Sequence, residues 1–380
     1  MRSLAAVALM ALLALAGCSG ADPKTPTGFG SGKTRTARAP AEAASRRGGP
    51  VDVYAADRPG RLSPGVGHYR PLVYVPNSQS NTVDVIDQRT YRVVDHFATG
   101  ALPQHVTPSW DLRRLWVTND LGNSLTPIDP RTGRHGRPVP VPDPYNIYFT
   151  PNGRYAIVVA ERLQRLDFRY AHSMRMHHSL TVDCKGMDHL DFTADGRHLL
   201  ASCEFSGKAI VVDVKRERVL RTVALAAGGM PQDVKLSPDG RVFYVADMAS
   251  NGVWLIDAHR FRKLGFLATG AGAHGLYASR DSRLLYVSNR GEGSITLISF
   301  RTRKPIDKWH LPGGGSPDMG GVSADGRLLW LSGRYNGEVY AISTRTGRLL
   351  KRIPVGAGPH GLCVYPQPGR HSLGHTGVFR

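Results

Sequence analysis

A five-residue turn motif recurs along this chain at nearly constant spacing, and this repeat constrains the fold more than any other feature. The motif is close to Ser-x-Asp-Gly-Arg, and its copies begin at Ser109, Thr150, Thr193, Ser237, Ser279 and Ser323. The intervals between copies are 41, 43, 44, 42 and 44 residues. Asp-Gly and Asn-Gly pairs favour tight hairpin turns, because glycine accepts the positive φ that such turns need. The sequence therefore predicts one hairpin-based unit repeated many times.

Short apolar strands surround each turn. A strand such as Phe243–Asp247 follows the turn directly, and a polar turn then leads to a third strand such as Val253–Asp257. A fourth strand and a Gly-Pro loop complete the unit. Four strands every 41 to 44 residues are typical of a β-propeller blade. We therefore predict an all-β domain over residues 71–380, a β-propeller with four antiparallel strands per blade.

The loops that open the innermost strands give the number of blades. One residue holds the equivalent position in each loop, and the seven residues are His105, Asn146, His189, Asp233, His274, Asp318 and His360. The first blade has its other strands at Leu72–Val75, Thr82–Asp87 and Val93–Ala98, with no innermost strand before them. His360–Tyr365 is predicted to supply that strand from the other end of the chain. Seven blades closed in this way leave no free sheet edge.

The strands after the turns also resemble those of a known family. Tyr74–Asn77, Trp116–Asn119 and Tyr286–Asn289 are similar to the repeats of the YVTN-repeat β-propeller family, as are Ala273–Gly275 and Pro359–Gly361. Members of this kind include surface-layer-like proteins, periplasmic propellers with DNA-binding ability and relatives of the haem d1 propeller of nitrite reductases. The resemblance implies the seven-bladed fold and no single activity.

Blade three departs from the family pattern. Its third strand is expected at Leu163–Asp167, and an insertion-like stretch, Tyr170–His178, is expected to replace a regular fourth strand.

The seven loop residues are expected to form a ring near one mouth of the channel, with Gln104 and Gln232 beside it. Imidazole and carboxylate groups are ligands of Zn, Cu, Fe or Mn, and the resemblance gives a precedent for a metal or haem at the axis. The possible metal ligands are His105, His189, His274 and His360. In the alternative interpretation these polar residues only brace neighbouring loops.

Cysteines add one covalent prediction. Cys184 precedes the innermost strand of blade four and Cys203 ends its second strand, so both are expected at the ring side. A disulfide is the expected state in an oxidising compartment, and a thiolate site of Cys184, Cys203 and His189 is the alternative. Cys363 is expected to be a small buried side chain.

Sequence patterns for hydrolysis are missing. His172, His177 and His178 have no recognised ligand geometry and are expected on a solvated outer face. The sequence shows no Ser-His-Asp order, Gly-rich phosphate loop or Cys-x₂-Cys pair. Turns of the Asp-Gly-Arg type recur from blade to blade and so cannot mark one catalytic site.

The N-terminus predicts secretion and lipidation. Residues 1–17 have a basic start and an apolar run, Leu4–Ala16, that is too short to span a bilayer. Leu15–Cys18 resembles the lipobox of bacterial lipoproteins, which implies lipidation of Cys18. Residues 18–70, rich in Pro, Gly, Ala and Arg, are expected to form a flexible basic linker.

The chain is strongly basic. The formal net charge is +19, which attracts nucleic acid, teichoic acids or anionic lipid; an arginine-rich composition from a GC-rich genome is the alternative explanation. Nucleic acid is not favoured, because aromatic residues are only 8% of the chain and mostly occupy strand core positions. Two functions remain for a monomer anchored outside the cytoplasm. One is a binding or scaffold module for a protein or anionic polymer, and the other is a metal- or cofactor-bearing protein of redox or hydrolytic type.

Overall fold

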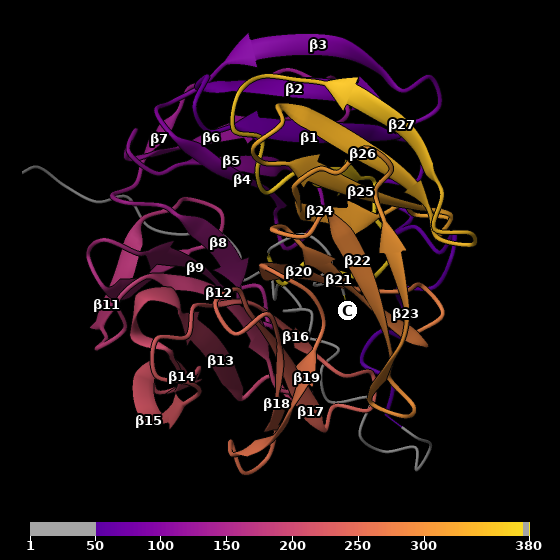
Figure 1. Ribbon diagram of the computed structural model, residues 1–380. Helices are drawn as coiled ribbons and strands as arrows, with labels where there is room; N and C mark the ends of the chain where they lie inside the picture. Colours follow the sequence, from indigo (N-terminus) through magenta and orange to yellow (C-terminus); the bar gives the residue numbers. More distant parts are fainter. Residues whose placement is uncertain (1–50, 375–379) are drawn as a thin grey trace, which may run out of the picture. The chain divides into compact units, whose positions relative to one another are not determined.

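The computed structural model describes residues 51–374 and residue 380. These residues form seven four-stranded antiparallel sheets, which surround one axis as the blades of a propeller (Figure 1). The predicted seven-bladed β-propeller is confirmed. Among the described residues, none forms a helix long and apolar enough to cross a membrane. The expected signal peptide, Cys18 and the linker up to residue 50 lie outside the described residues.

Each blade runs from an innermost strand at the axis to an outermost strand at the periphery. The innermost strands of blades two to seven are β4 (Pro103–Pro108), β8 (Asn146–Phe149), β12 (Met187–Phe192), β16 (Pro231–Leu236), β20 (Ala273–Ala278) and β24 (Pro317–Val322). The second strands are β1 (Leu72–Asn77), β5 (Leu115–Asn119), β9 (Tyr155–Ala160), β13 (His198–Cys203), β17 (Val242–Asp247), β21 (Leu284–Asn289) and β25 (Leu328–Gly333). A short 3₁₀ helix, Glu204–Ser206, follows β13.

The two outer layers of strands complete the blades. The third strands are β2 (Thr82–Asp87), β6 (Ser124–Ile128), β10 (Arg165–Tyr170), β14 (Lys208–Asp213), β18 (Gly252–Asp257), β22 (Ser294–Ser299) and β26 (Glu338–Ser343). The outermost strands are β3 (Arg92–Ala98), β7 (Val139–Pro140), β11 (Met176–Thr181), β15 (Arg218–Ala224), β19 (Lys263–Ala268), β23 (Lys304–His310) and β27 (Leu349–Pro354).

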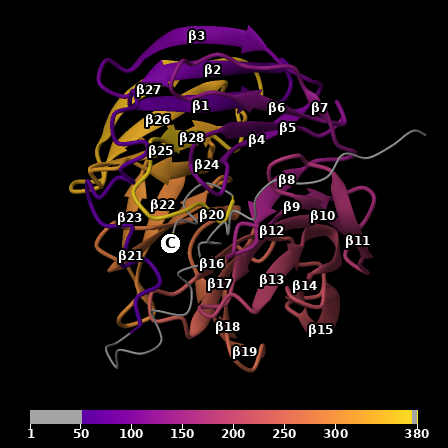
Figure 2. The ribbon, with the colours of Figure 1, turned by 180° about the vertical axis from the view of Figure 1, so that it is seen from behind.

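The first blade is closed by the two ends of the domain, as the sequence predicts. Its innermost strand is β28 (Cys363–Tyr365), which pairs antiparallel with β1 (Figure 2). The register places Leu72 opposite Tyr365 and Tyr74 opposite Cys363. Because β28 occupies the inner edge of this sheet, the circle of blades has no gap.

The antiparallel order gives the propeller two different faces. Turns that join the first to the second strand, and the third to the fourth, lie on one side, which we call the turn face. Loops that join the second to the third strand, and each blade to the next, lie on the other side, which we call the ring face. Each innermost strand therefore starts at the ring face and ends at the turn face.

The repeated motif forms the hairpin on the turn face. In blade four Asp195 accepts hydrogen bonds from the Arg197 amide at 3.0 Å and from the Thr193 hydroxyl at 2.6 Å, while Gly196 adopts a φ of +68°. Two blades lack this glycine, and there Leu112 and Ser282 take φ values of +63° and +60°. The turn geometry is therefore kept even where the preferred residue is missing.

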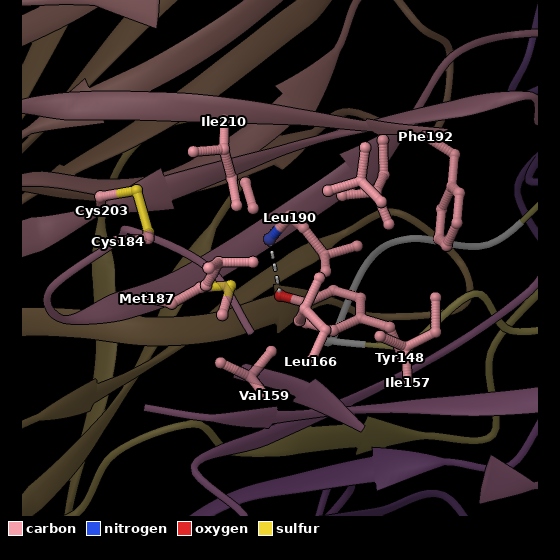
Figure 3. Packing of buried hydrophobic residues seen from close by; sticks show 14 of the residues in the cluster. Tyr148, Ile157, Val159, Leu166, Cys184, Met187, Leu190, Phe192, Cys203 and Ile210 are labelled. Atoms are coloured by element: carbon pink, nitrogen blue, oxygen red, sulfur yellow. Dashed lines mark hydrogen bonds between the residues drawn. A yellow bond between two sulfur atoms is a disulfide. The ribbon is translucent and has the colours of Figure 1, made fainter. Parts of the chain in front are cut away.

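Apolar side chains fill the space between neighbouring blades. Figure 3 shows the cluster between blades three and four, where Leu166, Phe192 and Ile210 are buried. The Tyr148 hydroxyl accepts a hydrogen bond from the Leu190 amide across this interface at 3.2 Å. Such packing between sheets supplies most of the stability of a propeller, because each blade has two apolar faces to bury.

Residues 51–70 correct the expected boundary of the linker. Tyr54 and Val66 are buried, the Val53 amide donates to the Pro238 carbonyl at 2.9 Å, and the Tyr54 hydroxyl donates to the Leu236 carbonyl at 2.7 Å. This part of the expected linker therefore belongs to the folded domain and lies on the turn face. The two apolar residues were too sparse among Pro, Gly and Arg to give a recognisable strand or helix pattern.

The C-terminal segment after β28 lies on the same face. The Leu373 carbonyl accepts a hydrogen bond from the Phe149 amide at 3.0 Å, and Arg380 forms an ion pair with Asp191 at 2.8 Å. Arg280, which is buried, pairs with Asp57 of the N-terminal segment and also donates to Gln367 of the C-terminal one. The two ends of the domain are therefore joined to each other and cover the turn-face end of the axis.

Blade three is complete, so the expectation that an insertion replaces its fourth strand is wrong. The third strand is β10, two residues later than expected, and β11 pairs with it as a regular outermost strand. A bulge between Phe168 and Arg169 shifts the register, as an equivalent bulge does between the third and fourth strands of five other blades.

Candidate binding site at the propeller axis

The seven predicted ring residues lie at the axis, but they form two layers instead of one ring. The amides of His105, His189, Gly275 and Met319 each donate to a Ser or Thr hydroxyl of the neighbouring second strand, at 2.8 to 3.2 Å, and so mark the same position. His274 and Asp318 therefore stand one residue earlier. His360 does too, because Pro359 pairs with Asn77 as Pro103 pairs with Asn119.

The layer nearer the ring face, called the upper layer, holds three of the predicted residues. Its members are Gln104, Tyr145, Asp188, Gln232, His274, Asp318 and His360. His274 Nδ1 lies 3.1 Å from Asp318 Oδ1, His360 Nε2 lies 3.6 Å from Asp318 Oδ2, and His360 Nδ1 lies 3.0 Å from Gln104 Oε1. All of these side chains are nearly or wholly buried, and their contacts run between neighbouring blades around the axis.

The layer beneath it, called the lower layer, holds the other four. Its members are His105, Asn146, His189, Asp233, Gly275, Met319 and Gly361. Asn146 Nδ2 lies 3.1 Å from His189 Nδ1, and the rings of His105 and His189 are 5.1 Å apart. Gly361 is required here, because a Cβ on it would lie 1.9 Å from His105 Nδ1.

A third set of residues surrounds the axis above these layers, and the sequence reasoning missed it. We call it the rim, and it consists of the residue directly after each second strand: Ser78, Asp120, Glu161, Glu204, Met248, Arg290 and Arg334. Blades two to four contribute carboxylates and blades six and seven contribute guanidinium groups. The signal was present in the sequence, because each of these residues stands at a fixed position relative to the predicted second strand.

The basic half of the rim is directed at Asp318. Arg290 Nη1 lies 3.2 Å from Asp318 Oδ1, and Arg334 Nε lies 3.9 Å from Asp318 Oδ2. Burial raises the pKa of Asp318 and the arginines oppose that rise. Burial, together with these arginines, also holds the pKa values of His274 and His360 well below the usual imidazole range. Both histidines are therefore neutral at pH 7.

In the acidic half of the rim, burial is the main influence on the pKa values of the carboxyl groups. Burial, together with the neighbouring carboxylates of Asp120 and Glu204, raises the pKa of Glu161 to about 8. Burial likewise raises the pKa of Asp188 and of Glu204. Burial also raises the pKa of Asp120, to about 6, although Arg162 lies 3.2 Å from Asp120 and 2.7 Å from Asp143. At pH 7 Glu161 is therefore mostly protonated, so the rim carries guanidinium cations on one side and carboxyl groups of reduced charge on the other.

Three side chains of the upper layer fit a single metal ion. One donor atom from each of His274, Asp318 and His360 lies within 4.8 Å of the others. Two donors bound tetrahedrally to zinc at ~2.1 Å lie about 3.4 Å apart, and the two His–Asp distances of 3.1 and 3.6 Å involve different oxygens of Asp318. Asp318 Oδ2 is buried without a hydrogen bond. His105 and His189, also predicted as possible ligands, are in the lower layer and outside this group.

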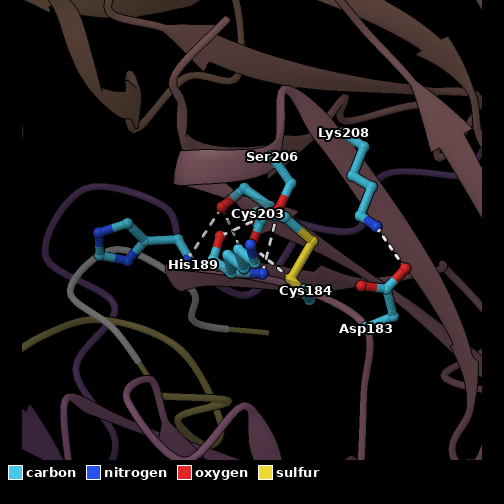
Figure 4. Close-up of a disulfide and its surroundings, with 8 residues drawn as sticks. Asp183, Cys184, His189, Cys203, Ser206 and Lys208 are labelled. Atoms are coloured by element: carbon cyan, nitrogen blue, oxygen red, sulfur yellow. Dashed lines mark hydrogen bonds and ion pairs between the residues drawn. A yellow bond between two sulfur atoms is a disulfide. The ribbon is translucent and has the colours of Figure 1, made fainter. Parts of the chain in front are cut away.

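The cysteine pair supports the loop that enters blade four. A disulfide joins Cys184 to Cys203 beside the innermost strand that carries His189 (Figure 4). Both cysteines therefore belong to the cross-link, not to a thiolate site with His189. Cys363 is a free, buried thiol, and burial raises its pKa.

The remaining predicted histidines lie away from the axis. His177 and His178 project from β11 and lie 3.4 and 2.8 Å from the Glu217 carboxylate, partly exposed. His172 is exposed in the preceding turn. These three residues do not approach the residues of the two axial layers.

The comparison with protein families now identifies the fold type of the whole repeat region. Residues 67–369 match the YNCE-like β-propeller family. The chain belongs to that family. No curated protein matches the sequence.

Solved structures of distant relatives share the architecture. Hydrazine synthase from Kuenenia stuttgartiensis has a TM-score of 0.57 at 18% identity, over 67% of this chain and 87% of that one. The dihydro-haem d1 dehydrogenase NirN in complex with DHE has a TM-score of 0.61 at 17% identity, over 80% and 76%. A functionally unknown protein from Desulfotomaculum acetoxidans has a TM-score of 0.63 at 12% identity, over 76% and 99%. At these identities the likeness shows the fold alone.

Proposed function

We propose that this chain is a lipid-anchored, extracytoplasmic binding module that captures a protein partner on its ring face. The observation that carries the proposal is a group of exposed apolar side chains at the loop tips around the rim. Leu121, Leu163, Phe205 and Tyr335 are 51%, 47%, 60% and 70% exposed. Three of them, Leu121, Phe205 and Tyr335, directly follow rim residues in three different blades. Exposed aromatic and apolar residues beside polar groups are typical of protein interfaces.

The charged groups of the rim indicate which kind of partner the ring face can bind. Asp120, Glu161 and Glu204 stand on one side of the rim, and Arg290 and Arg334 stand on the other. An anionic polymer would lie beside the carboxyl groups of blades two to four and would find Arg290 and Arg334 already directed at Asp318, so the ring face suits it poorly. A protein surface that offers hydrogen-bonding groups as well as charges suits both halves. Arg290 also lies 5.3 Å from the centre of the Tyr335 ring, which links the charged and apolar parts.

The axis itself offers little space for a large cofactor. The residues of the upper layer are buried, and those of adjacent blades touch around the axis. A haem would have to separate the blades or displace several of these side chains, whereas a protein can bind the exposed loop tips without any movement. The binding module is therefore preferred over a cofactor-bearing protein, although NirN, one of the structural relatives, is in complex with DHE.

Matched double substitutions test the proposal. Phe205→Ser with Tyr335→Ser should abolish capture of the partner that cross-links to the wild-type protein in intact envelopes. The control, Val94→Ser with Ile306→Ser, removes apolar groups that are 46% and 56% exposed on the outermost strands and should leave capture unchanged. If both variants capture the partner as the wild type does, the ring face is not the binding surface.

The anchor is tested separately. Cys18→Ser should leave the protein without lipid and move it from the detergent phase to the aqueous phase, because acyl chains contribute about 0.8 kcal/mol per buried CH₂. A variant that still partitions with detergent as the wild type does would show that Cys18 holds no lipid.

A bound transition metal is the second candidate function, favoured by the geometry of His274, Asp318 and His360. Both imidazoles are neutral, as metal binding requires. It ranks second because Arg290 and Arg334 already neutralise Asp318, and a divalent ion would have to compete with both of them. Titration of the purified protein with Zn²⁺ or Cu²⁺ should raise its melting temperature if this site binds metal, and Asp318→Asn should remove the effect.

A further inference from the structure

The turn face carries a dense array of cations. Its hairpins between first and second strands each end in an exposed arginine: Arg113, Arg154, Arg197, Arg241, Arg283 and Arg327. The hairpins between third and fourth strands add further arginines at the same end of the blades: Arg89, Arg92, Arg131, Arg134, Arg175, Arg216, Arg218, Arg260, Arg262, Arg301, Arg303, Arg345 and Arg348. Antiparallel topology places both sets on one side of the molecule.

The inner hairpins nearly neutralise themselves. Arg197 lies 3.7 Å from Asp195, Arg283 lies 3.7 Å from Asp281, and the pair in blade seven is similar. These pairs are exposed and contribute little net charge to the face.

The outer hairpins leave cations in excess, above all in blades six and seven. Among the described residues, no carboxylate lies within ion-pair distance of Arg301, Arg345 or Arg348, whereas Arg303 pairs with Asp239 at 3.5 Å. Lys304 begins β23 beside them and has no carboxylate partner among the described residues either. The net positive charge of the turn face therefore comes mainly from its outer circle of hairpins.

The opposite face does not share this charge. The rim presents Asp120, Glu161 and Glu204, and its two arginines are turned inward onto Asp318. Lysines near the ring face are largely paired, as Lys208 is with Asp183 and Lys308 is with Glu292. The domain is consequently polarised, with its positive charge concentrated on the turn face.

The N-terminal end of the described domain lies on the positive face. Val51 packs near Gly240 of a turn-face hairpin, and Val53 bonds to Pro238 of the same hairpin. A lipid attached at Cys18 would therefore be tethered to the basic side of the propeller. Anionic lipid attracts basic residues by about 1 kcal/mol for each one close to the surface.

From this combination we infer that the turn face docks onto an anionic lipid bilayer and holds the ring face toward the solvent. This inference rests on the proposed function only where it invokes the lipid anchor. The charge distribution is a property of the folded domain itself. Docking presents the exposed loop tips of the ring face to a partner and keeps them away from the membrane.

Vesicle sedimentation tests the inference without the anchor. The full chain with Cys18→Ser should bind vesicles containing about 30% phosphatidylglycerol and should not bind pure phosphatidylcholine, and binding should be lost as NaCl rises from roughly 50 mM to 500 mM. This variant carries no lipid, so an absence of vesicle binding would overturn the docking inference without bearing on lipidation of Cys18. Conversely, a wild-type protein without lipid would overturn the proposed anchor without changing the vesicle result.

Two matched variants localise the surface. Arg301→Gln, Arg345→Gln and Arg348→Gln together should weaken vesicle binding at least ~tenfold. The control, Lys185→Gln, Lys208→Gln and Lys308→Gln, removes the same charge near the ring face and should change binding less than about twofold. Equal losses in both variants would overturn the inference, as would binding to single-stranded DNA but not to anionic vesicles.

Discussion

Replacing Cys184 and Cys203 together by alanine removes the only disulfide among the described residues and tests how blade four is held. The cross-link closes a loop of 19 residues. A loop of that length lowers the entropy of the unfolded chain enough to stabilise the folded state by about 3 kcal/mol. Two buried sulfur atoms are lost as well, which adds on the order of 1 kcal/mol.

The melting temperature should fall measurably as a result. The unfolding entropy is about 2.1 cal/mol/K per residue, so a domain of roughly 320 residues loses about 4 to 6 °C for a change of this size. Differential scanning calorimetry at neutral pH measures the shift. Cys363→Ala is the control, because it removes one buried sulfur and no cross-link.

The site should respond together with the stability. The cross-linked segment leads directly into Asp188 and His189, and the His189 amide donates to the Ser202 hydroxyl at 3.1 Å. Hydrogen exchange of the amides in β12 should therefore increase in the double variant. A double variant that melts no lower than Cys363→Ala would refute the reasoning, since the loop-closure entropy would then contribute nothing.

Two further substitutions test the axis. Gly361→Ala should destabilise the domain by about 2 to 4 kcal/mol, because the new Cβ would lie 1.9 Å from His105 Nδ1 and the Gly361 backbone is hydrogen-bonded to blade two through both its amide and its carbonyl. Urea unfolding measures the loss, with Gly265→Ala as the control because its new Cβ meets no atom within 4 Å. Equal losses of stability in the two variants would contradict the two-layer arrangement. Glu161 has a folded-state pKa raised to about 8, so the stability linked to its proton is present at pH 4 and lost as the pH rises toward 8. Glu161→Gln should therefore melt higher than the wild type at pH 8 and equally at pH 4, and a difference that grows toward acid pH would reverse the assigned sign.

Periodicity predicted the blades but could not separate the axial layers. A bulge interrupts the pairing at the start of most innermost strands, for example between Pro231 and Val234. One residue of shift moves a side chain to another layer. Counting from the recurrent proline at Pro103, Pro231, Pro317 and Pro359 would have separated the layers, whereas matching polar residues by type combined them into one ring.

The sequence pattern could not predict the contacts between distant segments, for a different reason. Arg280 is the second residue of an ordinary turn motif, and its sequence gives no sign that Asp57 and Gln367 will bury it. The disulfide partners could be proposed because the blade repeat fixed both positions at the same end of one sheet. Residues outside the repeat, such as Tyr54, have no equivalent position in a blade from which their contacts could be predicted.

The distribution of arginine bears on whether the positive charge is functional or compositional. A GC-rich genome would enrich arginine on both faces, yet the described arginines lie mostly in the turn-face hairpins, and the rim of the ring face carries only Arg290 and Arg334 beside its acidic residues. Turn geometry does not demand arginine either.

The outer hairpins need a hydrogen-bond acceptor at their start, which Asp257 provides to the amides of His259 and Arg260 at 2.9 Å. In blades six and seven that carboxylate is replaced by Ser299 and Ser343, while the arginines remain. The same two blades therefore keep the cations without that carboxylate. Ser299 still accepts a hydrogen bond from the Thr302 amide at 3.3 Å, so the turn keeps its acceptor. The loss of the counter-charge is what the proposed docking onto an anionic surface would favour.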